Sequence, residues 1–186
     1  MTLLSPIVKA ARRGIWSGGS EVCVPLWQPN GINQQLSVSI PVSIGTTISF
    51  TLVVSDVKDT TDTIFDTAER VRVRLLSSGV WDVANGSLFV DGVATPGNSA
   101  LPPLGSVVNC VFMSSVVTNL MYIGSFLGSG VFSSQSIYNL SIDGGAIYNY
   151  PLDDGFTNNP TARNLGSGAD GTFINNDAGA WGERCE

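Results

Sequence analysis

The amino-acid sequence predicts an all-β protein, an antiparallel β-sandwich of the jelly-roll type, on three observations. Charged residues make up 13% of the 186 residues, about half of their share in a typical soluble domain. The chain is rich instead in Ser, Thr, Asn and Gly, which favour strands and turns over helices. Apolar and small polar residues alternate in several segments, and about ten short strands at this spacing are typical of a sandwich or jelly roll.

The clearest strand is predicted over residues 36–44. Apolar residues occupy its even positions, from Leu36 to Ile44, while small polar residues and Pro41 occupy the odd ones. This period of two indicates a strand with one buried face. Because Pro41 has no N–H to donate, the strand lies at a sheet edge or is bulged there. Residues 45–47 turn the chain into a second strand of the same kind over residues 48–54.

An arginine stripe follows, because the alternation of residues 70–75 places Arg70, Arg72 and Arg74 on one face. Such a stripe could hold phosphate or sulfate groups. We favour a solvated outer face, with the arginines paired to acidic residues that precede them, namely Asp56, Asp59, Asp62 and Asp66.

Turn residues predict two hairpins. Asn85-Gly86 suits a tight primed turn and, with Asp91-Gly92 after it, predicts a hairpin in this region. The sequence Asp-Gly-Gly at 143–145 predicts another, between strands over 137–142 and 146–152. Residues 107–127 are long and apolar enough to suggest a membrane span. Their polar and β-branched residues favour buried strands, so we expect no membrane span.

We divide the chain into an N-terminal arm, residues 1–20, and one β domain, residues 21–186, which includes a Gly- and Asn-rich C-terminal segment. The arm holds the one plausible helix, over residues 7–13. Its apolar residues precede its charges, the wrong order for a signal peptide. We therefore expect synthesis in a cytoplasm without export by that route.

Composition excludes several classes of function. The chain has no histidine, which removes Ser-His-Asp and Cys-His catalytic systems and zinc sites that need imidazole. The net charge is −6, and a nucleic-acid-binding protein should instead show a basic face. Three of the nine basic residues lie within the first thirteen positions, so a small basic arm precedes an acidic body.

The three cysteines, Cys23, Cys110 and Cys185, show no CxxC spacing and cannot all pair within the chain. We favour buried thiols at two of them, with the third near the C-terminal end. One disulfide with a leftover thiol is the alternative.

Two groups of motifs resemble known families. Residues 121–124, Phe132 and residues 137–142 are similar to the late strands of laminin-G/concanavalin-like jelly rolls. Residues 150–155 and 170–175, together with Trp181, resemble a signature of tailed-bacteriophage virion proteins that carry such domains. Two departures concern the ligand site: the acidic pair is Asp-Asp at 153–154 without the usual Glu, and residues 133–136 replace a more usual Gly.

The resemblance raises two kinds of chemistry. Concanavalin-like glucanases use carboxylates in an E-x-D-x-E run on one strand face, and no such run occurs here. Adjacent Asp153 and Asp154 would point to opposite faces, so we expect no enzyme activity. Laminin-G relatives often bind calcium, which makes Asp153, Asp154, Asp170 and Asp177 candidate Ca²⁺ ligands. We favour ordinary turn residues there, and hence no cofactor.

Carbohydrate binding is a further implication of the resemblance. Sugar sites use exposed aromatic rings, and the candidates for glycan binding are Trp81, Tyr148, Tyr150 and Trp181. Aromatic residues of a sandwich are more often part of its core.

From these observations we expect a non-catalytic structural protein of a bacteriophage virion, of the capsid-decoration or head-fibre type, that binds the major capsid shell. Its partners would be other virion proteins and further copies of itself, such as a trimer, and its location the virion surface after synthesis in the host cytoplasm. The predicted docking residues of the arm are Lys9, Arg12, Arg13, Ile15 and Trp16. The alternative is a tail-associated receptor-binding module for host surface glycans.

Overall fold

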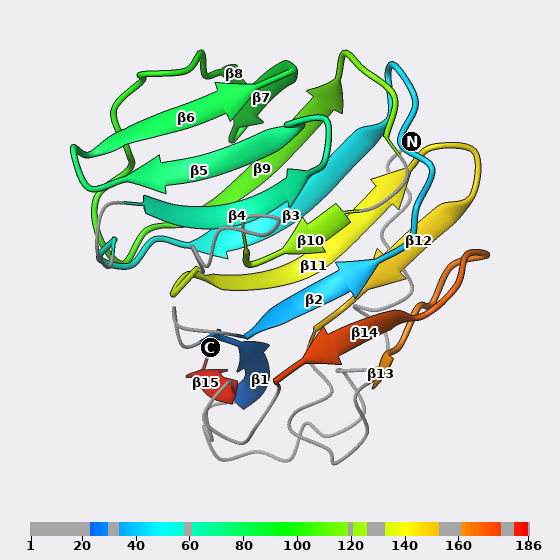
Figure 1. Cartoon of the computed structure of the whole chain (residues 1–186). Coiled ribbons are helices and arrows are strands. Elements are labelled where there is room, and N and C mark those ends of the chain that lie inside the picture. Colours follow the sequence, from blue (N-terminus) through cyan, green and yellow to red (C-terminus); the bar gives the residue numbers. More distant parts are fainter. Residues whose placement is uncertain are drawn as a thin grey trace, which may run out of the picture.

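The computed structural model describes residues 23–29, 34–57, 61–118, 121–125, 133–152, 161–175 and 181–185. The described residues form fifteen strands and no helix, arranged as two antiparallel sheets that face each other (Figure 1). The predicted all-β sandwich is confirmed. The arm and its predicted helix lie outside the described residues, as do the docking residues Lys9, Arg12, Arg13, Ile15 and Trp16.

Sheet A has eight strands and sheet B has seven. In spatial order, sheet A consists of β15 (Trp181–Cys185), β1 (Cys23–Trp27), β11 (Ser136–Asp143), β3 (Thr47–Val53), β9 (Val107–Ser114), β7 (Gly86–Val90) and β8 (Val93–Ala94), with β12 (Ile147–Tyr150) also paired to β11. Sheet B consists of β13 (Thr161–Ala162), β14 (Gly171–Ile174), β2 (Gln35–Val38), β10 (Met121–Ile123), β4 (Thr61–Thr67), β5 (Arg72–Leu76) and β6 (Val80–Ala84).

The core lies between the inner faces of the two sheets. The alternation predicted the buried positions of the first strand, since Leu36, Val38 and Val42 are fully buried, but Ile44 is exposed. The strand itself ends at Val38, and Pro41 lies outside the ladder. Aromatic rings join the sheets at the centre of the core. Phe65 of β4 contacts Phe112 of β9 edge-on, with ring centroids 5.2 Å apart.

The predicted hairpin turn at Asn85-Gly86 is wrong. β6 belongs to sheet B and β7 to sheet A, so the chain passes from one sheet to the other at the single residue Asn85. Asn85 adopts a left-handed conformation, with φ of 55°, and its side chain donates hydrogen bonds to the carbonyls of Glu69 and Arg70. The tight turn comes one strand later, where Asp91 and Gly92 both have positive φ between β7 and β8, as a type I′ hairpin requires.

The long apolar segment forms β9 and β10, one strand in each sheet. Its strand character is thus confirmed. In the described part of the chain there is no helix long and apolar enough to cross a membrane. The hairpin at residues 143–145 is also confirmed, as the connection between β11 and β12.

Two outer strands have their open edges occupied by irregular segments. Residues 98–101 run alongside the outer edge of β6. The Trp81 N–H donates a hydrogen bond to the Ser99 carbonyl, and the Asn98 N–H donates one to the Trp81 carbonyl. Residues 164–168 run alongside the outer edge of β12 in the same way. The Leu165 N–H donates a hydrogen bond to the Asn149 carbonyl, and the Ser167 N–H donates one to the Ile147 carbonyl. The main-chain groups of Trp81 on β6, and of Ile147 and Asn149 on β12, are therefore already paired.

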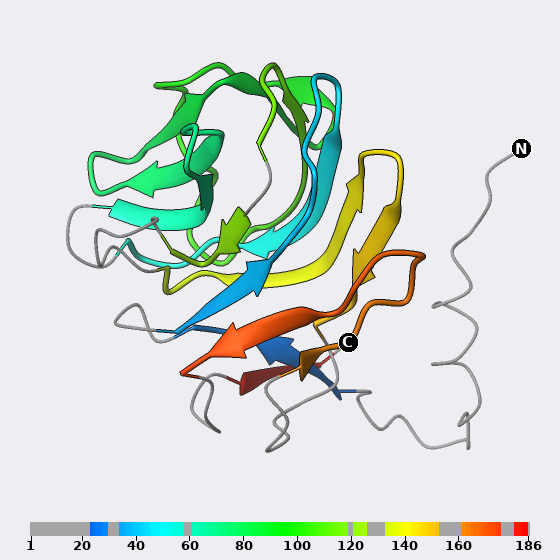
Figure 2. The same cartoon turned by 45° about the vertical axis from the view of Figure 1, so that its right-hand side comes forward.

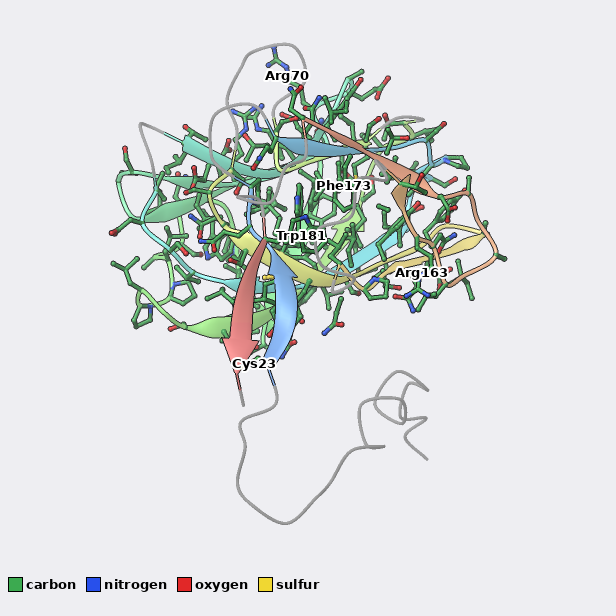
Figure 3. All side chains as sticks on the ribbon, turned by 90° about the horizontal axis from the view of Figure 1, so that it is seen from below. Cys23, Arg70, Arg163, Phe173 and Trp181 are labelled. Carbon is green, nitrogen blue, oxygen red and sulfur yellow. The ribbon has the colours of Figure 1, made fainter. Side chains whose placement is uncertain are left out.

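Strands β1 and β15 form a two-stranded ribbon, hereafter the terminal ribbon, at one margin of sheet A (Figure 3). Its register runs from Cys23 opposite Cys185 to Trp27 opposite Trp181. β1 is joined to β11 at a single register pair, Trp27 with Ile137. Trp27 is fully buried, and its ring centroid lies 5.5 Å from that of Phe173. The ring centroids of Phe173 and Trp181 are 5.8 Å apart. These three aromatic rings attach the ribbon to the sandwich.

Candidate functional site

Of the four aromatic residues predicted to bind glycans, three are buried. Trp81 and Tyr150 are each 1% exposed, and Tyr148 is 7% exposed. The rings of Tyr148 and Tyr150 stack on each other, and the Tyr150 hydroxyl donates to the Ala169 carbonyl. Burial, followed by the neighbouring Tyr148 and Asp170, raises the pKa of Tyr150. These three rings offer no face to a sugar, and Trp181, which is half-buried, is the one candidate of the four that is not buried.

Among the predicted calcium ligands, Asp170 alone lies within the described residues. Its Oδ1 accepts a hydrogen bond from the Asn164 N–H at 2.7 Å, which is the local capping contact of a turn residue. Asp153, Asp154 and Asp177 lie outside the described residues. In the part of the chain that the structure covers, no three acidic or cysteine residues are grouped so as to hold a metal ion.

The arginine stripe of β5 is an ion-pair network on the outer face of sheet B. Arg74 Nη2 lies 2.8 Å from Asp66 Oδ2, and Arg72 Nε lies 3.0 Å from Asp82 Oδ2. The predicted pairing is confirmed for Asp66, but the predicted solvated face is not, since Asp66 is fully buried. Arg70 lies before β5, and the second acidic partner is Asp82 on β6, which sequence reasoning missed. Arg72 and Arg74 are both paired with carboxylates, which leaves less reason for a phosphate or sulfate site here.

Asp66 is fully buried although it points to the outer face. Burial raises the pKa of its carboxyl group, and hydrogen bonds from Arg74 and from the Thr67 N–H lower it by less. Tyr122 of β10 stands directly opposite Asp66 in the register and is half-buried. An aromatic ring thus borders the ion-pair network on the outer face of sheet B.

A second buried carboxylate, Asp62 at the start of β4, lies at one end of the core. Asp62 accepts hydrogen bonds from the Ser134 hydroxyl at 2.8 Å and from Gln135 Nε2 at 2.5 Å. Gln135 in turn accepts a hydrogen bond from the Ser55 N–H and donates to the Ser55 carbonyl. These contacts join three chain segments. The available signal was the departure at residues 133–136 from the laminin-G-like pattern that the sequence resembles, and all four of these residues are buried.

One end of the sandwich exposes large hydrophobic side chains and is nearly free of charge. It is built from the turns at 41–46 and 143–147, the segment 113–118 and the loop 164–168, which gather along one side in Figures 1 and 2. Backbone hydrogen bonds join the turn at 41–46 to the segment 113–118, for example from the Gly45 N–H to the Ser114 carbonyl, and join the loop 164–168 to Ile147. Gly144 lies against Thr46. We call the exposed set the apolar end: Ile44 (72% exposed), Met113 (44%), Val117 (59%), Ile147 (56%) and Leu165 (45%).

Asp143 is the one charged residue in the four segments that carry the apolar end. Scattered surface hydrophobics are ordinary, but several gathered together mark contact sites. Sequence reasoning missed this surface because Ile44 continued the buried pattern of its strand.

The cysteines correct the interpretation favoured from the sequence. Cys23 is exposed and disulfide-bonded, so two free buried thiols at Cys23 and Cys110 are excluded. Cys110 is free and buried in β9, where burial and the nearby Asp91 raise the pKa of its thiol to about 12. A thiol with so high a pKa is a poor nucleophile at neutral pH.

Comparison of the chain with protein-family models, curated proteins and solved structures gave no match.

Proposed function

We propose that this protein is a non-catalytic accessory subunit of a bacteriophage virion that binds the capsid shell. The observation that carries the proposal is the apolar end, where five exposed hydrophobic side chains are accompanied by one carboxylate. Contact surfaces between subunits are poor in charge at their centre. The basic arm, with Arg12, Arg13 and Trp16, would provide the second contact, since Arg and Trp are common anchors of interfaces.

The chemistry of the described carboxylates favours a structural role over catalysis. Asp66 pairs with Arg74, and Asp62 accepts hydrogen bonds from Ser134 and Gln135. A glycosidase needs two carboxyl groups on either side of a scissile bond. These two buried groups are committed to packing contacts.

The virion assignment itself is supported by the resemblance of residues 150–155 and 170–175 to phage virion proteins. The disulfide of Cys23 is consistent with it, because disulfides persist in oxidising surroundings such as virion surfaces. We further propose that the subunit is a homo-oligomer, such as a trimer, on the shell.

Cryo-electron microscopy of the native particle with a bound antibody tests the proposal. We expect the label across the head, and we expect deletion of residues 1–16 to remove the protein from particles while the β domain still folds. A label confined to the tail, or full occupancy without the arm, would contradict capsid docking.

The alternative is a tail-associated receptor-binding module, and one observation favours it. Tyr122 is half-buried on the outer face of sheet B beside the Asp66–Arg74 pair, and aromatic rings with polar neighbours suit sugars. On this alternative, Tyr122→Ala or Trp181→Ala would abolish binding on a glycan array, whereas deletion of the arm would not. Absence of glycan binding by the intact protein would exclude it.

A further inference from the structure

The terminal ribbon is held at its two ends by different means. At its base, Trp27 is buried against Phe173. Phe173 in turn contacts Trp181, and both are labelled in Figure 3. At its far end, Cys23 is exposed and disulfide-bonded. Between these ends, β1 has β15 as its ladder partner over all five positions and meets β11 at Trp27 alone.

The cysteine count and the register identify the second half of the disulfide. The chain has three cysteines, and Cys110 is free and buried in sheet A. The register places Cys185 directly opposite Cys23. Residues directly opposite in an antiparallel pair have α-carbons about 4.5 to 5.5 Å apart, within the span that a disulfide bridges. We infer that Cys23 and Cys185 form this disulfide.

The position of the bond matters because the arm joins the sandwich at Cys23. A pull on the arm would act on the first residue pair of the ribbon. Without the bond, β1 would separate from β15 one pair at a time, starting at the tip. Each backbone hydrogen bond contributes little net stabilisation, so such peeling meets little resistance. With the two strands joined at the first pair, peeling cannot begin.

We propose that this disulfide is a redox-sensitive lock on the terminal ribbon. While it is intact, the ribbon stays closed under load from the arm. After reduction, β1 and β15 open from the tip, and the sandwich stays folded, since the core does not depend on the pair at Cys23. Opening of the ribbon on reduction is a property of the isolated fold, whereas a load on the arm rests on the proposed docking.

Reduction by a dithiol such as dithiothreitol is a complete reaction. A thiolate of the reagent attacks one sulfur, breaks the protein S–S bond and forms a mixed disulfide, which frees one cysteine thiolate. The second thiol of the reagent then closes its own ring and frees the other cysteine. Two electrons and two protons pass from the reagent to the protein.

Hydrogen–deuterium exchange of the full chain, oxidised and then reduced with dithiothreitol, tests the lock. We expect the amides of Cys23, Val24, Leu26 and Trp27 and of residues 181–185 to exchange faster, on the order of tenfold or more, after reduction, because the ribbon can then open from its tip. Amides of β3 and β9 should keep their exchange rates. Non-reduced peptide mapping should find the peptides of Cys23 and Cys185 linked.

Matched variants keep the result interpretable. Cys23→Ser and Cys185→Ser should each show fast exchange in the ribbon from the start and no response to dithiothreitol. If a variant does not fold, reduction of the native protein alone decides the question. Unlinked peptides, unchanged exchange in the ribbon, or equal acceleration in β3 and β9 would each overturn the proposal. Because isolated protein is measured, such a failure would leave capsid docking untouched.

Discussion

Asp62 is a carboxylate with no exposed surface, and it accepts hydrogen bonds from the uncharged donors Ser134 and Gln135. Burying a charged or polar group is costly unless hydrogen bonds replace the lost water. Here the replacement comes from a segment more than seventy positions away in the chain. The contact therefore holds the start of β4 against residues 134 and 135, and we infer that Asp62 has a structural role.

We expect Asp62→Ala to lower the free energy of unfolding by about 2 to 4 kcal/mol, because it leaves buried donors without an acceptor and opens a cavity. Urea denaturation followed by tryptophan fluorescence measures the change. Glu69→Gln, at an exposed carboxylate, is the control and should shift stability by no more than about 0.5 kcal/mol. Equal stability of Asp62→Ala and the native protein would refute the structural role.

Asp66 provides a prediction of pH dependence. Burial raises its pKa above the ordinary value of 3.8 despite the pair with Arg74. The folded state then binds a proton more readily than the unfolded chain, so the contribution of this group to stability is present below pH 3.8 and is lost as the pH rises through the folded pKa. Relative to Asp66→Asn, which lacks the titration, the native protein should gain stability as the pH falls toward 3.8. Urea midpoints of both proteins across this range measure the difference, and a native protein that loses stability relative to the variant would show that Arg74 outweighs burial.

At the scale of the element, the corner between β6 and β7 depends on two neighbouring residues. Asn85 adopts φ of 55° and binds two carbonyls of the preceding segment. Gly86 then starts β7 directly against the core. A β-carbon placed on Gly86 would lie 2.0 Å from the ring of Phe112 and 2.5 Å from the Met113 carbonyl oxygen. Asn85 thus determines the direction in which the chain leaves β6, and Gly86 allows β7 to pack closely against Phe112.

Gly86→Ala should therefore destabilise the protein by about 1 to 3 kcal/mol, the usual range for overpacking a core. Gly97→Ala is the matched control, since its added β-carbon would meet nothing closer than 3.6 Å. Thermal denaturation of both variants provides the comparison. Equal melting temperatures would show that the corner relaxes without strain.

At the scale of the whole molecule, the apolar end should matter for binding and not for folding. Ile44 and Val117 are 72% and 59% exposed, so their replacement by Ser should change the free energy of unfolding by no more than about 0.5 kcal/mol. If this end contacts the shell, Ile44→Ser combined with Val117→Ser should reduce the amount of protein on purified particles. Val93→Ser, at a side chain 68% exposed on β8, is the control. Full occupancy of the double variant would remove the apolar end from the docking surface.

Local patterns predicted the sandwich because strand burial is a local property. The period of two located the buried residues from Leu36 to Val42, and the Asp-Gly-Gly turn located the β11–β12 hairpin. The same reasoning failed at Asn85, because its left-handed conformation suits both a hairpin and a passage between sheets. Choosing between them required the packing of Gly86 beneath Phe112.

Candidate site residues were harder to predict, because a sequence does not say which side of a strand faces the core. Trp81 and Tyr150 were candidates for sugar stacking by type, and both lie inside. The disulfide of Cys23, the contact of Asp62 with Gln135 and the apolar end all join positions far apart in the chain. No spacing rule connects such positions, so they became visible only in the folded chain.

In a dense population of identical β-proteins, an open strand edge invites a neighbour to extend the sheet and start a fibril. At the outer margins of β6 and β12, the main-chain groups of Trp81, Ile147 and Asn149 are already bound to residues 98–99 and 164–168. A neighbouring strand that approached either margin would find few donors and acceptors left to bind. At these margins, crowded copies of the protein would contact one another through side chains. They would remain separate molecules and would not join into one continuous sheet.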